Sequence, residues 1–394
     1  MLSGCEFHLH SCVPGSILTR RPPPRTCKYF SSSCAPALFR SIHLDEAKLQ
    51  FHQRILENLG HLVRDLTLNV KCGLDDNEEQ PIYDILWYLP HIRSLTVIHE
   101  REDIASHMPL KRALDRLQHL EAVTLLEKDY DSAFPYLTVP EVEVSQTLFH
   151  RFLENVLNVH GRRLQALHIY TLLPLDQALY IKIRDETPNL RSVTFSGNIT
   201  VALRKKFGEP TPWASGQTGS LKSLIFDTCE GAHAGYFAHN VLRGVYGKQL
   251  MEAGIIACDA NDDERFVPFT PIDSIGSIDH FFIDHMFSWE MEALSRIPTR
   301  DLSFTRLIPD NFIQLPKLLS PAPSDSDLTR VGFRGLKRLR LSRRVASHEA
   351  WEAYPDECRT AYEELKDKYL PQRGIHLSLD ATGWPDPCTS HPHM

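Results

Sequence analysis

Hydrophobic and polar residues follow one short pattern, which is clearest within residues 188–196. In this stretch Leu190, Val193 and Phe195 are apolar, and most of the residues around them are polar. Successive side chains of a β-strand point to opposite faces of the sheet, so Val193 and Phe195 are expected to point inward and Thr194 outward. A single copy is typical of any half-buried strand, and its significance therefore depends on recurrence.

The same pattern recurs along most of the chain, and residues 375–379 are expected to form a closing strand. Six clear copies begin at residues 63, 92, 120, 164, 190 and 221, so neighbouring starts lie 29, 28, 44, 26 and 31 residues apart. The interval of 44 is interpreted as one repeat with an insertion. The apolar positions of all copies are Phe39/Ile42/Leu44, Val63/Leu66/Leu68, Ile92/Leu95/Val97, Leu120/Val123/Leu125, Leu164/Leu167/Ile169, Leu190/Val193/Phe195, Leu221/Leu224/Phe226, Leu250/Ala253/Ile255, Ile278/Phe281/Ile283, Thr299/Leu302/Phe304 and Leu336/Leu339/Leu341.

Several intervals between these copies show the spacing of an amphipathic helix. Ile82, Ile85, Leu86 and Leu89 occupy positions i, i+3, i+4 and i+7, and a final helix is expected over about residues 347–370. One strand and one helix per repeat predict an α/β fold, an irregular leucine-rich-repeat-like solenoid with parallel strands on the concave face and helices on the convex face. A doubly wound α/β sheet is the alternative, but its buried strands would be nearly continuous apolar runs.

The composition changes near both ends of the chain. Residues 1–33 contain three cysteines, a run of three prolines and a run of three serines, and they lack the continuous apolar core of a secretory signal. We expect residues 1–33 to be a disordered tail, with a transit peptide as the alternative. The solenoid is expected over residues 34–380, ending in a C-terminal helix and closing strand at 346–380, and a second disordered tail over 381–394.

Composition and charge narrow the class of protein. The 394-residue chain is 42% hydrophobic and 24% charged, with a net charge of −7, and an acidic balance argues against a dedicated nucleic-acid binder. The sequence contains no apolar stretch of about 18 residues, so no transmembrane helix is predicted. The nine cysteines are irregularly spaced without a CxxC pair, which favours reduced thiols and a cytoplasmic or nuclear location.

The outward positions of the repeats are the candidate partner-binding residues, because solenoids usually bind on their concave sheet. Threonine recurs in the middle position, for which β-propensity is the alternative explanation. Neighbouring outward positions suggest an aromatic and acidic middle and a basic C-terminal end. The predicted partner-binding set is Asp65, Thr67, Thr96, Thr124, His168, Tyr170, Thr194, Asp227, Asp284, Arg338 and Arg340.

Sequence motifs for catalysis, cofactors or metals are weak. The chain has no phosphate loop, no GxGxxG and no GxSxG. Two Cys/His groups lack the paired knuckles of a zinc site, and one acidic loop lacks the glycine and glutamate of a calcium loop. We predict no catalytic, cofactor-binding or metal-binding residue, with a hydrolase of unrecognised site as a remote alternative. These three groups are Cys5/His8/His10/Cys12, Cys229/His233/His239 and Asp259/Asn261/Asp263.

Three segments carry a resemblance to a known family. Residues 35–44, 61–68 and 365–377 resemble the end of the F-box with the first strand, the second strand, and the terminal helix with the closing strand of fungal F-box/leucine-rich-repeat-like proteins. The resemblance implies a substrate-recognition subunit of a cullin-RING ubiquitin ligase, with a Skp-type adaptor on the F-box and a protein substrate on the repeats. In such a complex other subunits transfer ubiquitin, so this chain would not itself be an enzyme.

The sequence departs from that family at its start. Most of the F-box is missing, because residues 1–33 contain neither its three helices nor its Leu-Pro-x-Glu phrase, and only residues 34–45 match the end of the F-box and the first strand. Either the N-terminus reflects a faulty gene model or the protein binds partners without joining a ligase. A leucine-rich-repeat scaffold with no ligase link is therefore the alternative function.

Overall fold

The fold was examined in a computed structural model of the chain. The structure describes residues 35–45, 55–70, 85–99, 114–127, 150, 153–170, 177–196, 221–227, 249–256, 277–283, 295, 297–304, 309–319, 333, 335–341 and 356–378. Both predicted tails and the three Cys/His and acidic motifs lie outside these residues.

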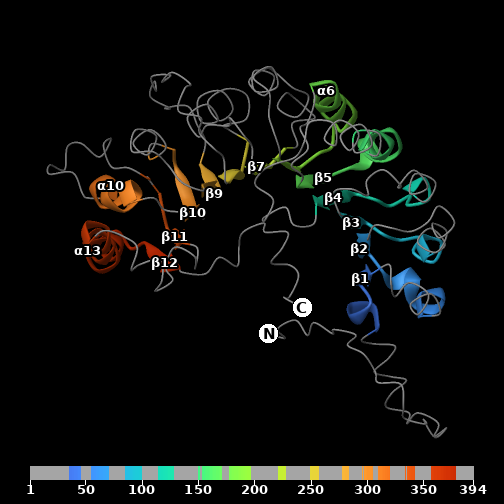
Figure 1. The fold of residues 1–394 in the computed structure, drawn as a ribbon, viewed down its shortest axis with the longest axis horizontal. Coiled ribbons are helices and arrows are strands. Elements are labelled where there is room, and N and C mark those ends of the chain that lie inside the picture. Colours follow the sequence, from blue (N-terminus) through green and yellow to red (C-terminus); the bar gives the residue numbers. More distant parts are fainter. Residues whose placement is uncertain are drawn as a thin grey trace, which may run out of the picture.

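One sheet of twelve parallel strands runs through the molecule, and each strand pairs with the next strand along the chain. The strands line the inner side of an arc, and helices α6, α10 and α13 lie outside it (Figure 1). This order has no reversal point, unlike a doubly wound sheet. The strands are β1 Ser41–Asp45, β2 Asp65–Val70, β3 Ser94–His99, β4 Ala122–Glu127, β5 Ala166–Tyr170, β6 Ser192–Ser196, β7 Ser223–Asp227, β8 Glu252–Ile256, β9 Ile278–Ile283, β10 Thr299–Phe304, β11 Arg338–Leu341 and β12 His376–Ser378.

Every predicted copy of the pattern coincides with a strand, including the weak ones. The first apolar residue of the clear copies, such as Val63, Leu164 and Leu190, is fully buried. At the least regular copy Thr299 replaces this apolar residue, and its hydroxyl donates to the carbonyl of Ile297 at 3.1 Å. A buried polar group without such a partner would destabilise the fold, so this hydrogen bond makes the substitution tolerable.

The core lies between the sheet and the outer helices. Helix α6 (Gln177–Glu186) buries Tyr180, whose ring meets Phe195 of β6 edge-on with centroids 6.1 Å apart. Phe195 in turn stacks on Phe226 of β7 at 6.3 Å. Each aromatic side chain buried in this way contributes roughly 1.5–3 kcal/mol, so packing passes continuously from one repeat to the next.

The C-terminal helix differs in detail from the prediction. Its described part comprises α13 (Asp356–Glu364), a π-helical turn η8 (Leu365–Tyr369) and α14 (Leu370–Gln372); the predicted residues 347–355 lie outside the described residues. It ends at Gly374, whose φ of 64° suits glycine. The amides of Gly374 and Ile375 donate to the carbonyls of Pro371 and Leu370, which is the Schellman pattern. Helix α10 (Pro309–Leu319) packs against α13.

Two glycines allow close approach between neighbouring repeats. Gly60 opens the 3-10 turn η2 (Gly60–Leu62), and Gly161 opens η4 (Gly161–Arg163) at the equivalent position of a later repeat. A Cβ atom would lie 2.0 Å from the carbonyl oxygen of Tyr88 at the first position and 2.7 Å from that of Glu186 at the second. Backbone oxygens cannot move aside as flexible side chains do, so neither site can accept a side chain without displacing the next repeat.

We predict that Gly60→Ala lowers the free energy of unfolding by about 1–3 kcal/mol, because the added methyl group collides with the next repeat. Urea unfolding followed by circular dichroism measures the change. Gly161→Ala should have a smaller effect, because the added Cβ atom would lie farther from the nearest carbonyl oxygen. Equal stability of Gly60→Ala and the wild-type chain would contradict the packing seen at η2.

Candidate protein-interaction surface

The concave face is built from side chains that point away from the core. Cα register aligns one outward residue from every strand in a continuous row across the sheet. Neighbours in such a row lie about 4.8 Å apart. The row is His43, Thr67, Thr96, Thr124, His168, Thr194, Ile225, Gly254, Phe282, Ser303, Arg340 and Ser378. The predicted residue Thr194 is buried, as are Ile225, Phe282 and Ser303, so these four offer little surface to a partner.

The N-terminal half of this face is uncharged over β3 to β6 and is made of small side chains. The predicted residues Thr67, Thr96 and Thr124 are all half-buried and adjacent in register. A second row beside them, two residues earlier in each strand, contains Ser94, Ala122, Ala166, Ser192 and Ser223. The result is a shallow floor with hydroxyl groups that can both donate and accept hydrogen bonds.

His168 is the exception in this row, and its surroundings keep its ring neutral. Its Nδ1 is hydrogen-bonded to Oγ1 of Thr194 at 2.9 Å, and its ring stacks on Tyr170 with centroids 6.4 Å apart. Burial lowers the pKa of His168 from 6.5 to about 4, because the surroundings disfavour the charged form. At neutral pH His168 therefore adds hydrogen-bonding capacity to the floor without adding charge.

Tyr170 belongs to a small apolar cluster that sequence reasoning missed. Ile98, Leu126 and Tyr170 are in register on β3, β4 and β5, and they form a buried cluster separate from the main core. The side chain of Tyr170 is only 4% exposed. The signal in the sequence is a second apolar residue directly after the last inward one, as in Val97-Ile98 and Leu125-Leu126.

The C-terminal half of the concave face is charged. Asp301 of β10 is nearly buried, and its Oδ2 lies 3.3 Å from Nη1 of Arg338 and 3.2 Å from Nη2 of Arg340. Nδ1 of His280 approaches the same oxygen at 3.6 Å, and the His280 ring stacks on Phe282. The structure thus brings together both predicted arginines, around an aspartate and a histidine that were not predicted.

Of the three remaining predicted residues, the structure describes the side chain of only one. Asp65 lies on β2 and forms an exposed ion pair with Arg40 at 3.7 Å. Asp227 is the last residue of β7, and only its backbone position is described. Asp284 follows β9 and lies outside the described residues.

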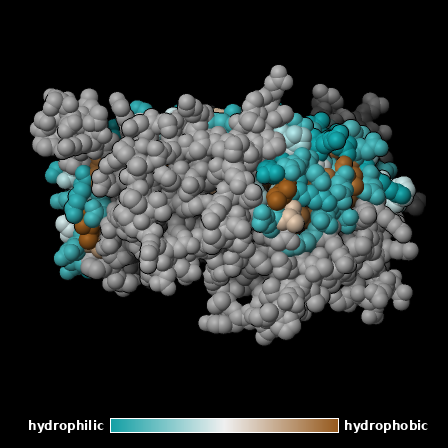
Figure 2. All heavy atoms as spheres, turned by 90° about the horizontal axis from the view of Figure 1, so that it is seen from above, coloured by the Kyte–Doolittle hydropathy of each residue, from teal (hydrophilic) through white to brown (hydrophobic). Residues whose placement is uncertain are grey.

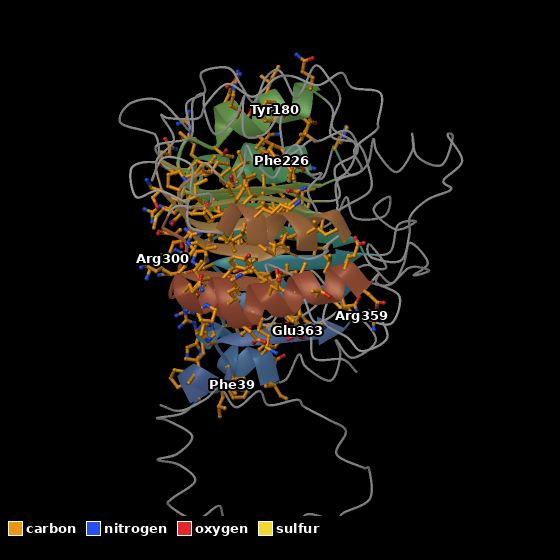
Figure 3. All side chains as sticks on the ribbon, turned by 90° about the vertical axis from the view of Figure 1, so that its left-hand side faces the viewer. Phe39, Tyr180, Phe226, Arg300, Arg359 and Glu363 are labelled. Atoms are coloured by element: carbon orange, nitrogen blue, oxygen red, sulfur yellow. The ribbon has the colours of Figure 1, made fainter. Side chains whose placement is uncertain are left out.

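A further feature is the edge at which the strands begin. The second row continues through Asp65 on β2, His280 on β9, Asp301 on β10 and Arg338 on β11, and we call the residue just before its member in each strand the rim position. It is basic in seven strands, and Figure 3 shows Arg300 at this edge pointing away from the sheet. Within the described part of the chain, Arg40 is the only one of the seven in an ion pair. The basic rim residues are Arg40, Arg64, Arg93, Arg191, Lys222, Arg300 and Lys337.

The outer surface offers less to a partner. Seen from above, the described residues are mostly hydrophilic, with small separate hydrophobic areas (Figure 2). The large exposed apolar side chains of the described residues, Leu38, Trp87 and Met251, lie in three different repeats. The guanidinium of Arg116 covers the ring of Trp87 at 2.8 Å from its centroid. Scattered apolar residues of this kind are ordinary on protein surfaces.

The described residues contain neither a candidate metal cluster nor a membrane-spanning helix. There, no group of three or more His, Cys, Asp or Glu side chains is arranged to hold a metal ion. None of the helices in the same part of the chain is long and apolar enough to span a bilayer.

We predict that His168 makes stability depend on pH. Its pKa is about 4 in the folded state and 6.5 in the unfolded chain, so the unfolded state binds more protons between these values. The free energy of unfolding is therefore highest above pH 6.5 and decreases as the pH drops toward 4. The decrease is at most about 3 kcal/mol, and it is smaller if solvent reaches the ring. Urea unfolding at pH 7 and 4.5 should show a smaller loss for His168→Gln than for the wild-type chain.

The exposed His376 provides the control, because His376→Gln should keep the wild-type dependence. An unchanged pH dependence in His168→Gln would contradict the neutral, buried ring.

The candidate surface is therefore defined by its geometry, with a neutral floor on β3 to β6 and a charged end on β9 to β11. Comparison of the chain with protein-family models and with curated proteins finds no match.

Proposed function

We propose that this protein is a recognition module of the leucine-rich-repeat type, which binds another protein on the concave face of its sheet. The observation that carries the proposal is the sequential order of twelve parallel strands on the inner side of an arc. Repeat proteins of this build present one extended concave surface, on which each repeat supplies one or two outward side chains. Such a surface suits an elongated protein segment better than a small molecule, which needs a deep, mostly apolar pocket.

The chemistry of the surface also supports a protein partner. Protein interfaces combine hydrogen-bonding groups with charged side chains that set the orientation of the partner. The floor at Thr67, Thr96 and Thr124 supplies hydrogen-bonding groups. The region around Arg338 and Arg340 supplies charged side chains. Neither half needs a cofactor for binding.

The resemblance to fungal F-box proteins gives a finer form of the proposal. In it the concave face captures a protein to be ubiquitinated, a Skp-type adaptor links the chain to a cullin-RING ligase, and other subunits carry out the chemistry. The alternative is a scaffold with no ligase link. A pull-down with a Skp-type adaptor on this chain separates the two, since a ligase subunit would retain the adaptor and a scaffold would not.

We predict that Thr96→Arg combined with Thr124→Arg reduces the specific capture of partners at least about tenfold, because two long charged side chains would obstruct the floor. The matched control is Thr360→Arg, the same substitution at an exposed position of α13 outside the arc. Quantitative mass spectrometry of proteins retained by each variant measures the effect, with circular dichroism to confirm folding. Equal capture by the double variant and the wild-type chain would contradict recognition on the concave face.

A further inference from the structure

The charged end of the concave face carries more positive charge than it neutralises. We define the C-terminal basic cluster as Arg300, Lys337, Arg338 and Arg340, on β10 and β11 and at their amino-terminal ends. Among the described residues, Asp301 is the only carboxylate within ion-pair distance of any member. Asp279 of β9 lies opposite Arg300 in the register without forming an ion pair, so two carboxylates lie beside four basic side chains.

Asp301 also fixes the direction of two of these side chains. Its Oδ2 contacts Arg338 and Arg340 at nearly equal distances, 3.3 and 3.2 Å, while its own side chain is 9% exposed. A guanidinium has five N–H groups, and Asp301 contacts one nitrogen of each. The Nε of Arg340 is buried, but the side chains of Arg338 and Arg340 are 46% and 20% exposed, so other N–H groups of both remain accessible. Both arginines are thus held by one anchor with donors left for a second acceptor.

The spacing of the cluster fits an extended peptide. Arg338 and Arg340 occupy alternate positions of β11, so both lie on the concave face, about 6.5–7 Å apart along the strand. Alternate residues of an extended peptide have the same separation. Lys337 and Arg300 are exposed beside them on neighbouring strands at the amino-terminal rim, and Figure 3 shows Arg300 at that edge.

We infer that the C-terminal end of the concave face binds an extended acidic segment of the protein partner, with carboxylates of alternate residues on Arg338 and Arg340. Asp301 is a positioning residue that holds both guanidinium groups toward the groove. This segment runs along β11, across the arc, and the neutral floor over β3 to β6 contacts an uncharged part of the same partner. This inference rests on the proposed function and specifies the chemistry of its partner.

A protein fits this charge pattern better than a nucleic acid. The chain as a whole has a net charge of −7, which repels a long polyanion. A nucleic acid would require basic residues along its whole backbone. The basic rim is instead interrupted at Glu121, Gln165 and Met251, and on the concave face the paired arginines are confined to β11. An acidic peptide segment needs complementary charge only where its own carboxylates lie.

The test is fluorescence anisotropy of the full chain with a labelled twelve-residue peptide of alternating glutamate and serine, with glutamine replacing glutamate in the control peptide. We expect binding of the glutamate peptide that weakens with salt, and at least about tenfold weaker binding by the R338E/R340E variant. The R191E/K222E variant makes the same charge change at exposed rim residues of β6 and β7 and should alter binding less than about twofold. Equal binding of both peptides, equal losses in both variants, or tighter binding of an RNA oligomer of equal charge would overturn the inference.

Asp301→Asn separates positioning from simple charge attraction. The substitution raises the local positive charge, so charge alone predicts tighter binding of the glutamate peptide. Loss of the shared anchor instead predicts binding weakened about threefold or more, and tighter binding would overturn the role of Asp301. If Asp301→Asn fails to fold, R338K/R340K serves the same purpose, because lysine keeps the charge but lacks the planar fork that pairs with carboxylates.

The experiments distinguish failure of this inference from failure of the proposed function. If the wild-type chain does not bind the glutamate peptide but partner capture still depends on Thr96 and Thr124, the acidic-segment inference alone fails. If capture is also insensitive to the concave face, the proposed function fails with it.

Discussion

The structure depends on a backbone contact repeated at the edge where the strands begin. From Arg40 to Lys222, the carbonyl of each rim residue accepts hydrogen bonds from two successive amides of the next repeat, as Arg40 does from Arg64 at 2.8 Å and Asp65 at 3.0 Å. The carbonyls of Arg300 and Lys337 accept one such bond each, from Lys337 at 2.8 Å and His376 at 2.9 Å. Because it uses only main-chain atoms, this contact fixes the register of β1 to β8 whatever side chains the rim and the concave face carry.

Because these main-chain contacts do not depend on the outward side chains, the inward apolar positions are enough to predict most of the strands. Inward positions must be apolar to be buried, so even the weak copy at Leu250 and Ala253 marks a strand. Contacts across repeats could not be predicted in the same way. His280, Asp301 and Arg338 are 21 and 37 residues apart in sequence and meet only because the register aligns them. The close approach at Gly60 is equally invisible to a periodicity argument, since it depends on where the carbonyl of Tyr88 falls.

The candidate site combines both kinds of information. Alternation along the strands places Thr67, Thr96 and Thr124 on the concave face, and the structure agrees. Alternation also gives Arg338 and Arg340 a shared face, but only the fold shows that Asp301 holds them together. The two ends of the face consequently differ in physical character, a neutral hydroxyl floor and a preorganised cationic end. A partner that matches both would be bound in one direction only.

We propose that partners occupy the concave face rather than the outer helices. Site-specific photo-crosslinking can distinguish the two surfaces, with a photoreactive amino acid placed at Thr124 on β4 or at Thr360 on α13. If partners bind on the concave face, a captured partner will crosslink from Thr124 and not from Thr360. Crosslinking from Thr360 alone would contradict the proposal, because the partner would then lie on the outer side of the arc.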